Sequence, residues 1–591
     1  MAALLRPAFI AVLACLALPA VASADQPTGL TATAGAREVD LSWDRVNMGD
    51  GVHDVHVLVR RNGAVVGSVD RADTSFADTD IQPGARYRYT VQGVGLQGDG
   101  DRVTTQRSEP ARIELPNYFV GAATADITPT GIVNLGGFGL GDGSVFPDAV
   151  IGRGHTGQEV NERIAARAVV FGDGKNTIAI ADIETQGMFA AYEDGAYGLQ
   201  DMAKQVAKDI KGLPADHILI ASDHTHSGPD TIGAWGGPPA GYLELVKKQT
   251  IKAIEDAFAN RRLADVRSGH SDASDLIYNQ ACTEALNQDK EPAYPGPDAC
   301  ATPGKDGFFR VLQATDTDGQ VVTTYTAYAA HATAGGGNGL HGDWPQFLSD
   351  RMASDFGGVG MAMEGANGGT QPCRSACSFT DPKNPGYNVG DRKQALMLNY
   401  MAHVNDALSR SQPVRGPIAA TQGTIREAIT GPAVTALFTA GQHVGARLLR
   451  SHENPWVVGH TIKTITSALR VGGILFAGTP GEGFPAIGDG VRNAVKGTQE
   501  VIQLGLANDQ LGYLIAPASY VPVIAAEAPV NDDIIFNVSP TIGDHVMCSD
   551  ISLSLSLGFL GQSPPQCAPY DAADSTGDPI AQVPVGGVVL P

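Results

Sequence analysis

The sequence predicts a layered α/β domain preceded by a small all-β sandwich. The chain has 591 residues, a length that favours two to four domains over one. Residues 26 to about 115 alternate apolar and polar side chains between turn signals, which is the pattern of short strands. From about Val120 onward, strand-like apolar runs alternate with helical patterns. Alternation of this kind is typical of a fold in which helices cover a mixed sheet.

The composition limits the classes of partner. Lys and Arg number 41 against 63 Asp and Glu, and the formal net charge is −22. Nucleic-acid binding requires basic patches, so we expect no nucleic-acid partner. Beyond the N-terminal segment, no stretch is long and apolar enough to predict a transmembrane segment. The oligomeric state does not follow from the sequence.

Residues 1–24 have the pattern of a secretory signal peptide. Arg6 precedes an apolar run that ends at Ala22-Ser23-Ala24, a small-x-small cleavage site. We expect a mature chain that begins near Asp25 and is secreted or periplasmic. A lipoprotein signal at Cys15 ranks second, because the apolar run continues past that cysteine. Six later cysteines fall into three close sequence pairs, which predicts three local disulfides: Cys282, Cys300, Cys373, Cys377, Cys548 and Cys567.

The first predicted domain covers residues 25–115. Trp43 stands in an early strand-like run, and the pair Tyr87 and Tyr89 follows the turn "IQPG". These features resemble a fibronectin type III domain, which implies a spacer or adaptor but assigns no activity. The segment "RSEPARIELPNYF" links it to the large domain, predicted at 118–570. The tail, 571–591, lacks helical periodicity.

Candidate catalytic residues follow three apolar runs. "ILIASDHTHSGP" ends in His224 and His226, "TTYTAYAAHATAGGGNG" ends in His331, and "GGILFAGTPGEGF" ends in Glu482. Loops after the carboxyl ends of strands form the sites of α/β proteins. Imidazoles and a carboxylate that meet there fit a catalytic zinc site with an open position for water. The His-x-His spacing suits one ligand and one second-shell or acid/base histidine.

The motifs "ASDHTHSGPD", "AAHATAGG", "GTPGEGF" and "GLANDQLGYL" occur in an order that resembles the neutral ceramidase family. The likeness runs from about Val120 to Tyr513 and includes "VGAATADITPTG", "ERIAARAVVF" and "EGANGGTQP". It implies that zinc is held by His224, His331, Glu482 and Tyr513. It also implies that His226 transfers protons. Tyr513 would either bind the metal or donate a hydrogen bond to the oxyanion.

The loop Gly369-Thr370-Gln371 is predicted to line the substrate side and departs from that family. Gln371, with Thr370 beside it, occupies the place of a serine treated as catalytic. Neutral ceramidases have an Asn-Arg pair whose arginine faces the substrate. The corresponding residues of this chain are Asn279 and Gln280. Replacement of arginine by glutamine removes a fixed charge and a fork of five donors. These departures imply a changed substrate rather than loss of zinc.

Four acidic residues are weaker candidates. Asp182 and Glu184 follow a strand-like run and would be second-shell residues or a solvated strand end. Asp343 is expected to cap a helix that begins near Trp344. Asp223 would orient one imidazole.

The leading hypothesis is therefore an exported zinc-dependent hydrolase that cleaves an amide of a small, lipid-like N-acylated amphiphile. A second hypothesis is a metal-dependent esterase or lactonase on the same scaffold, since the serine and arginine positions differ. A third is a non-catalytic surface binding protein on a retired enzyme fold. The four intact ligand positions argue against the third hypothesis.

Overall fold

We describe a computed structural model of the chain. It covers residues 24–131, 133–137, 160, 162–193, 195–233, 235, 237–279, 305–335, 339–373, 392–430, 461–515 and 537–570. The chain divides into two compact units, with the main division between Leu115 and Pro116 and with residues 82–84 belonging to the second unit. Among the described helices, none combines the length and the apolar character needed to cross a bilayer.

In the described residues of the first unit, all regular structure is β. Its strands form a sheet of three, in the order β1-β2-β5, and a second sheet in the order β4-β3-β6-β7, with β8 also paired to β6. Buried and exposed residues alternate along β3, which is the pattern of a sheet with one face on a core. The bounds are β1 Thr31–Ala34, β2 Val39–Ser42, β3 His53–Arg61, β4 Ala64–Asp70, β5 Ser75–Asp78, β6 Arg86–Leu96, β7 Arg102–Thr104 and β8 Ala111–Glu114.

The second unit contains two large mixed sheets. The first has the order β12-β11-β10-β9-β13-β15-β16-β17, with β19 on β13, and the second has the order β20-β21-β22-β25. Their strands are β9 Tyr118–Asp126, β10 Ala165–Gly172, β11 Thr177–Ile183, β12 Ile218–Ser222, β13 Arg262–Asp272, β15 Phe308–Asp316, β16 Val321–Tyr328, β17 Val359–Glu364, β19 Gln412–Pro413, β20 Ile418–Ala428, β21 Thr461–Val471, β22 Ile474–Gly478 and β25 Glu500–Leu504.

Three short strand pairs complete the β structure of this unit. They are β14 (Ile277–Asn279) with β18 (Thr370–Pro372), β23 (Glu482–Gly483) with β26 (Tyr513–Leu514), and β24 (Val495–Lys496) with β27 (Leu560–Gly561). The helices are α1 Leu199–Asp209, α2 Tyr242–Ala259, α3 Asp343–Phe356, α4 Arg392–Ser409, α6 Pro485–Ala494 and α9 Ile542–Ser556, with short 3-10 turns at Ala215–His217, Ser274–Leu276 and Pro565–Cys567.

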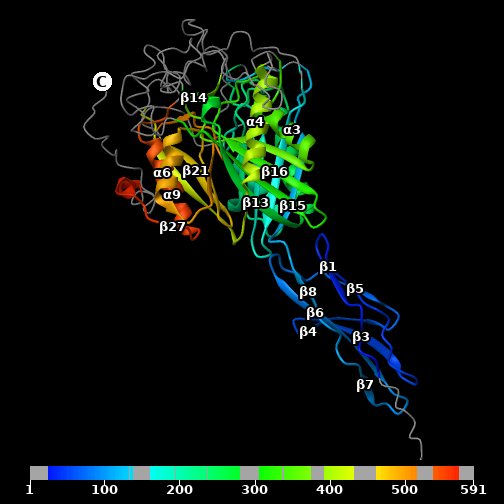
Figure 1. Ribbon diagram of the computed structural model, residues 1–591. Coiled ribbons are helices and arrows are strands. Elements are labelled where there is room, and N and C mark those ends of the chain that lie inside the picture. Colours follow the sequence, from blue (N-terminus) through cyan, green and yellow to red (C-terminus); the bar gives the residue numbers. More distant parts are fainter. Residues whose placement is uncertain are drawn as a thin grey trace, which may run out of the picture. The chain divides into compact units, whose positions relative to one another are not determined.

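The two sheets pack face to face between layers of helices. One buried cluster joins strands of both sheets, including Val169, Ile180, Phe476 and Ile502. Helices α2, α3 and α4 pack on the first sheet, and α9 packs on β20 and β21 of the second, as Figure 1 illustrates. Every residue of β10 and β12 is buried, as expected for strands covered on both faces.

The parallel strand pairs bring the predicted site residues to one region. The pairs β11–β12, β16–β17 and β22–β25 are parallel, whereas most of their neighbours in the two sheets are antiparallel. His224 follows β12 and His331 follows β16. Glu482 comes four residues after β22. The loops after these strands therefore carry the chemistry that the sequence predicted for them.

The predicted layered mixed α/β architecture is confirmed. The first unit is all-β in its described residues, while its assignment to the fibronectin type III family and the limits 25–115 and 118–570 stay predictions. The disulfide between Cys548 and Cys567 is present, with a sequence separation of 19. Cys373 is also disulfide-bonded. The signal segment, the 571–591 tail and three further cysteines lie outside the described residues: Cys282, Cys300 and Cys377.

Candidate metal centre

His224 leaves the line of its strand through an unusual backbone conformation. Strand β12 ends at Ser222, and His224 has φ of 52°, in the left-handed region that residues other than glycine rarely adopt. Its Nδ1–H donates a hydrogen bond of 2.8 Å to the main-chain oxygen of Gln186. The strand-alternation rule therefore does not apply to the His-x-His motif, because a turn, and not a strand, sets the direction of these side chains.

His331 is held in the same manner from another strand end. It comes three residues after β16, and its Nδ1–H donates a hydrogen bond of 2.9 Å to the main-chain oxygen of Thr370. The Trp344 indole N–H donates to the main-chain oxygen of His331 at 3.1 Å. His331 is fully buried. Both the ring and the backbone of this histidine are thus fixed by partners.

Glu482 and Tyr513 come from adjacent short strands. Strands β23 and β26 are parallel, and their register places Glu482 opposite Tyr513. The Tyr513 ring centroid lies 6.2 Å from that of His331 and 6.3 Å from that of Phe484. Both residues of the pair are buried. The structure therefore brings Tyr513, the fourth predicted ligand, beside Glu482 and near His331.

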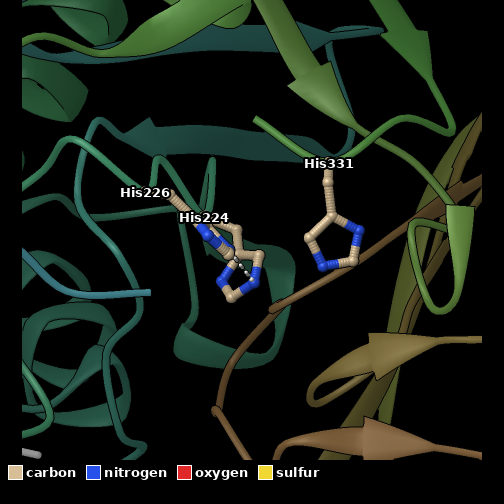
Figure 2. A group of neighbouring side chains, drawn as sticks. All are labelled: His224, His226 and His331. Atoms are coloured by element: carbon tan, nitrogen blue, oxygen red, sulfur yellow. Dashed lines mark hydrogen bonds between the residues drawn. The ribbon is translucent and has the colours of Figure 1, made fainter. Parts of the chain in front are cut away.

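The side chains of His224, His226 and His331 lie close together (Figure 2), and the Glu482 carboxylate lies beside two of them. The Oε2 atom of Glu482 lies 3.1 Å from Nε2 of His331 and 3.3 Å from Nε2 of His224. Nε2 of His226 lies 3.2 Å from Nε2 of His224. One nitrogen from each of the three histidines lies within 4.8 Å of the other two. Side chains from three separate loops thus present nitrogen and oxygen to a common centre.

This donor set fits a divalent zinc ion. In His224 and His331, Nδ1 carries the proton that a carbonyl accepts, so Nε2 presents a lone pair toward Glu482. Lone pairs and a carboxylate oxygen that face one another in a buried site repel each other unless a proton or a metal cation lies between them. Ligands at about 2.0–2.1 Å around a tetrahedral ion are about 3.3 Å apart, close to the separations found here.

The pKa shifts of Glu482 and His224 agree with a metal site at this position. Burial by itself would raise the pKa of Glu482, but the charges and hydrogen bonds of His224 and His331 hold that pKa well below its usual value. Burial disfavours the charged form of His224, yet Glu482 raises the pKa of that imidazole. The carboxylate is therefore anionic at neutral pH, as a metal ligand must be.

The predicted substrate-side loop lies next to His331. Gly369 has φ of 71°, a turn conformation that favours glycine, and Thr370 supplies the carbonyl that holds His331. The Thr370 hydroxyl is buried and donates to the main-chain oxygen of Asn367 at 2.9 Å. Gln371 accepts a hydrogen bond of 2.8 Å from the Thr333 hydroxyl. Gln371 is therefore tied to the loop that follows His331.

Asn279 and Gln280 were predicted to contact the substrate. Strand β14 pairs with β18, and the register places Asn279 opposite Thr370. The backbone of Asn279 thus lies beside the loop that holds His331. Gln280 lies outside the described residues.

All four acidic candidates are buried, so the expectation of a solvated strand end at Asp182 and Glu184 is wrong. Glu184 pairs with Arg167 at 2.8 Å. Oδ1 of Asp182 and Oδ2 of Asp223 have no hydrogen-bond partner among the described residues. Burial, followed by the charges of neighbouring carboxylates, raises the pKa of Asp182 and Asp223 well above its usual value. The imidazoles of His224 and His331 are oriented by main-chain carbonyls rather than by Asp223.

Asp343 holds the loop after His331. Helix α3 begins at this residue, whose carboxylate accepts from the amides of Ala334 at 2.9 Å, Gly335 at 2.8 Å and Trp344 at 2.6 Å. The expected helix start is confirmed, but the expectation that Asp343 caps the helix is wrong, because Gly342 occupies the N-cap position and no side chain caps this end. Two of the three partners of Asp343 belong to the loop. The first two amides of the "AGGGNG" loop thus bind the carboxylate of Asp343.

Sequence reasoning missed three contributors to the site. Gln186 acts through its main-chain oxygen, so its side-chain type carries no signal. Thr333 orients Gln371 across a gap of 38 residues. Glu364, at the end of β17, is buried and accepts a hydrogen bond from Asn367, and burial followed by the charge of Glu482 raises its pKa well above the usual value. Only the position of Glu364 after an apolar run would have pointed to it.

Comparison with known proteins establishes the fold. No protein-family model matches the chain, and no curated protein matches it either. Among solved structures, the neutral ceramidase from Pseudomonas aeruginosa superposes with a TM-score of 0.56 at 16% identity, covering 76% of this chain and 79% of that one. A ceramidase complexed with C2 superposes with a TM-score of 0.57 at 15% identity, covering 76% and 78%. The described chain therefore shares the fold of neutral ceramidases.

Proposed function

We propose that the protein is an exported zinc-dependent hydrolase that cleaves an amide bond in a small N-acylated amphiphile. The observation that carries this proposal is the convergence of His224, His331 and Glu482 on one point at the ends of three strands. The likeness in fold to the two ceramidase structures supports the amide as the bond cleaved. The Cys548–Cys567 disulfide supports an oxidising compartment.

We assign each residue of the site a role from its burial and its contacts. His224, His331 and Glu482 hold the metal, with Tyr513 beside Glu482 as a fourth ligand or as a hydrogen-bond donor to the oxyanion. Zinc, when bound, supplies a Lewis acid for the scissile carbonyl and lowers the pKa of a water molecule. The carbonyls of Gln186 and Thr370 keep the ligand nitrogens turned inward.

His226 transfers the proton to the leaving amine. It is only partly buried, whereas His224 is 3% and His331 0% exposed, so His226 faces the side from which a substrate arrives. Its main-chain N–H donates to the oxygen of Ala332 at 3.1 Å, which ties it to the loop after His331. A histidine whose pKa is near the working pH suits this task, because it both accepts and releases a proton.

The substrate differs from that of the structural neighbours at the reacting end. Gln371 replaces the serine of the related motif, and its side chain is oriented by Thr333. An amide side chain offers hydrogen bonds but no nucleophilic hydroxyl. We therefore assign Gln371 and Thr370 to positioning of the substrate carbonyl. Gly369, Asn279 and Gln280 then line the approach.

The test combines metal analysis with matched substrates. Full-length protein should contain stoichiometric zinc and should hydrolyse N-acyl compounds in preference to the O-acyl compounds of the same chain length. His224→Ala should lose both zinc and turnover. Faster hydrolysis of the O-acyl compounds would show that the protein cleaves an ester rather than an amide. Absence of zinc, or turnover unchanged in His224→Ala, would contradict the metal mechanism, and rapid cleavage of ceramide would contradict the altered substrate.

A further inference from the structure

A short segment, residues 133–137, runs beside the His-Thr-His motif. Leu135 forms an antiparallel bridge with Pro229, and the amide of Gly136 donates to the oxygen of Gly228 at 3.1 Å. The amide of Asp230 donates back to the oxygen of Asn134 at 2.9 Å. This segment is therefore in register with the residues that immediately follow His226.

Gly137 lies directly against the His226 ring. A β-carbon built on Gly137 would stand 2.4 Å from Cγ and 2.6 Å from Cδ2 of His226, closer than any real contact. Gly137 also has φ of 98°, which disfavours every residue except glycine. The His226 ring can occupy its place only because position 137 has no side chain.

Gly136 lies comparably close to Gln186, the residue whose main-chain oxygen orients the His224 ring. A β-carbon built there would stand 2.6 Å from Cγ of Gln186. The main-chain oxygen of Gln186 accepts the hydrogen bond from Nδ1 of His224. Two consecutive glycines thus contact the His226 ring and the residue that orients the His224 ring.

A buried anchor holds this segment rigid. The Asp230 carboxylate is fully buried and accepts hydrogen bonds from the amides of Ile232, Gly233, Trp235 and Gly237 at 2.7–3.2 Å. The Asn134 side chain donates to the oxygen of Gly237 at 3.1 Å. The glycine pair therefore rests on a fixed loop and cannot retreat freely from a clash.

We propose that Gly136 and Gly137 are the positioning residues of the His-Thr-His motif. Gly137 sets the place of the His226 ring, and Gly136 allows Gln186 to approach His224. The catalytic consequence of this inference rests on the proposed function, whereas the placement of the rings does not. Displacement of a catalytic group by about 1 Å can lower a rate about a hundredfold.

The test compares Gly137→Ala with Gly131→Ala in the full-length protein. Gly131 has φ of 83°, and a β-carbon there would meet no described atom within 4 Å, so this control carries the backbone cost without the clash. Diethyl pyrocarbonate should modify His226 several-fold faster in Gly137→Ala, as measured by mass spectrometry of the peptide. With an N-acyl substrate, kcat should fall about tenfold or more while KM stays within about twofold.

If Gly137→Ala matches Gly131→Ala in the modification rate of His226, the proposal is wrong, whatever the activity. If the ring moves but the protein cleaves no acyl compound, the proposed function fails and the positioning role stands. If Gly137→Ala does not fold, Gly136→Ala provides the test. The Gly136→Ala variant should increase the rate at which diethyl pyrocarbonate modifies His224. Adding Gln186→Ala should reverse part of this increase, because the clashing Cγ is gone. Unchanged His224 reactivity in Gly136→Ala would overturn the inference.

Discussion

Glu482 and Asp182 are both fully buried carboxyl groups in the second unit, yet their pKa values move in opposite directions. Glu482 faces two imidazoles at 3.1 and 3.3 Å, which hold its pKa well below the usual value. Asp182 has one oxygen without a hydrogen-bond partner among the described residues, and burial raises its pKa well above the usual value. The difference teaches that burial alone does not mark a metal ligand. The carboxylate proposed as a ligand is the one whose buried charge faces two imidazoles.

The largest expected effect comes from removing a partner of Glu482. His331→Ala should lower metal affinity by more than about a hundredfold, because a ligand nitrogen is lost. It should also destabilise the metal-free protein by about 3–5 kcal/mol, since Glu482 stays buried with one imidazole fewer. Metal titration and urea unfolding measure these two effects. His56→Ala, on an exposed part of β3, is the control. Unchanged metal affinity would remove His331 from the site.

The next effect concerns Asp509, a second buried carboxyl group whose pKa is raised by burial. Burial raises the pKa of Asp509 to about 6, despite hydrogen bonds from Ala190, Thr464 and Gln510. Its stabilising contribution is complete below the unfolded pKa of about 3.9 and is lost as pH rises to about 6. The loss amounts to about 3 kcal/mol. Urea unfolding of Asp509→Asn should therefore lack this decline between about pH 4 and pH 7. Parallel curves for the two proteins would contradict the raised pKa.

Asp182→Asn should separate structural from catalytic acids. The sign is the same as for Asp509: stability falls as pH rises through the raised pKa, and the amide removes that fall. Relative to wild type, the variant should therefore be more stable at pH 8 than at pH 4, as measured by urea unfolding at both pH values. Zinc content should remain that of the wild type. Loss of zinc in Asp182→Asn would place this carboxylate in the metal site and break the comparison.

The smallest expected effect comes from the hydrogen bond between the uncharged side chains of Thr333 and Gln371. Thr333→Val removes the hydrogen bond of 2.8 Å to Gln371 and keeps the side-chain shape. One neutral hydrogen bond contributes about 1 kcal/mol, so kcat/KM should fall about fivefold without loss of zinc. Steady-state kinetics on the preferred acyl substrate provides the measurement. Thr326→Val, at a buried position on β16 whose hydroxyl has no partner in the described part of the chain, is the matched control. Equal kinetics for the two variants would show that Gln371 needs no support from Thr333.

The local pattern of the chain was sufficient to predict the strand ends that carry the site. Apolar runs such as "ILIAS" and "VVTTYTAY" became β12 and β16, because such segments are stable only when both faces are covered. The helix beginning near Trp344 was predicted from local signals and is α3. The conformation of His224 was not, because a φ of 52° depends on contacts with distant segments.

By itself, the sequence determined the layered α/β class and the set of histidines and the glutamate that follow apolar runs, because periodicity and residue type are local properties. Only the tertiary structure decided that Oε2 of Glu482 lies 3.1 Å from Nε2 of His331 and 3.3 Å from Nε2 of His224, separations that suit the ligands of one zinc ion. It also decided which acids form an ion pair, as Glu184 does with Arg167, and which keep an oxygen without a hydrogen-bond partner in the described part of the chain, as Asp182 does. The contacts of Gly136 and Gly137 are also determined by the tertiary structure alone. A close approach depends on what lies opposite in space, and the one-dimensional order of residues does not contain that information.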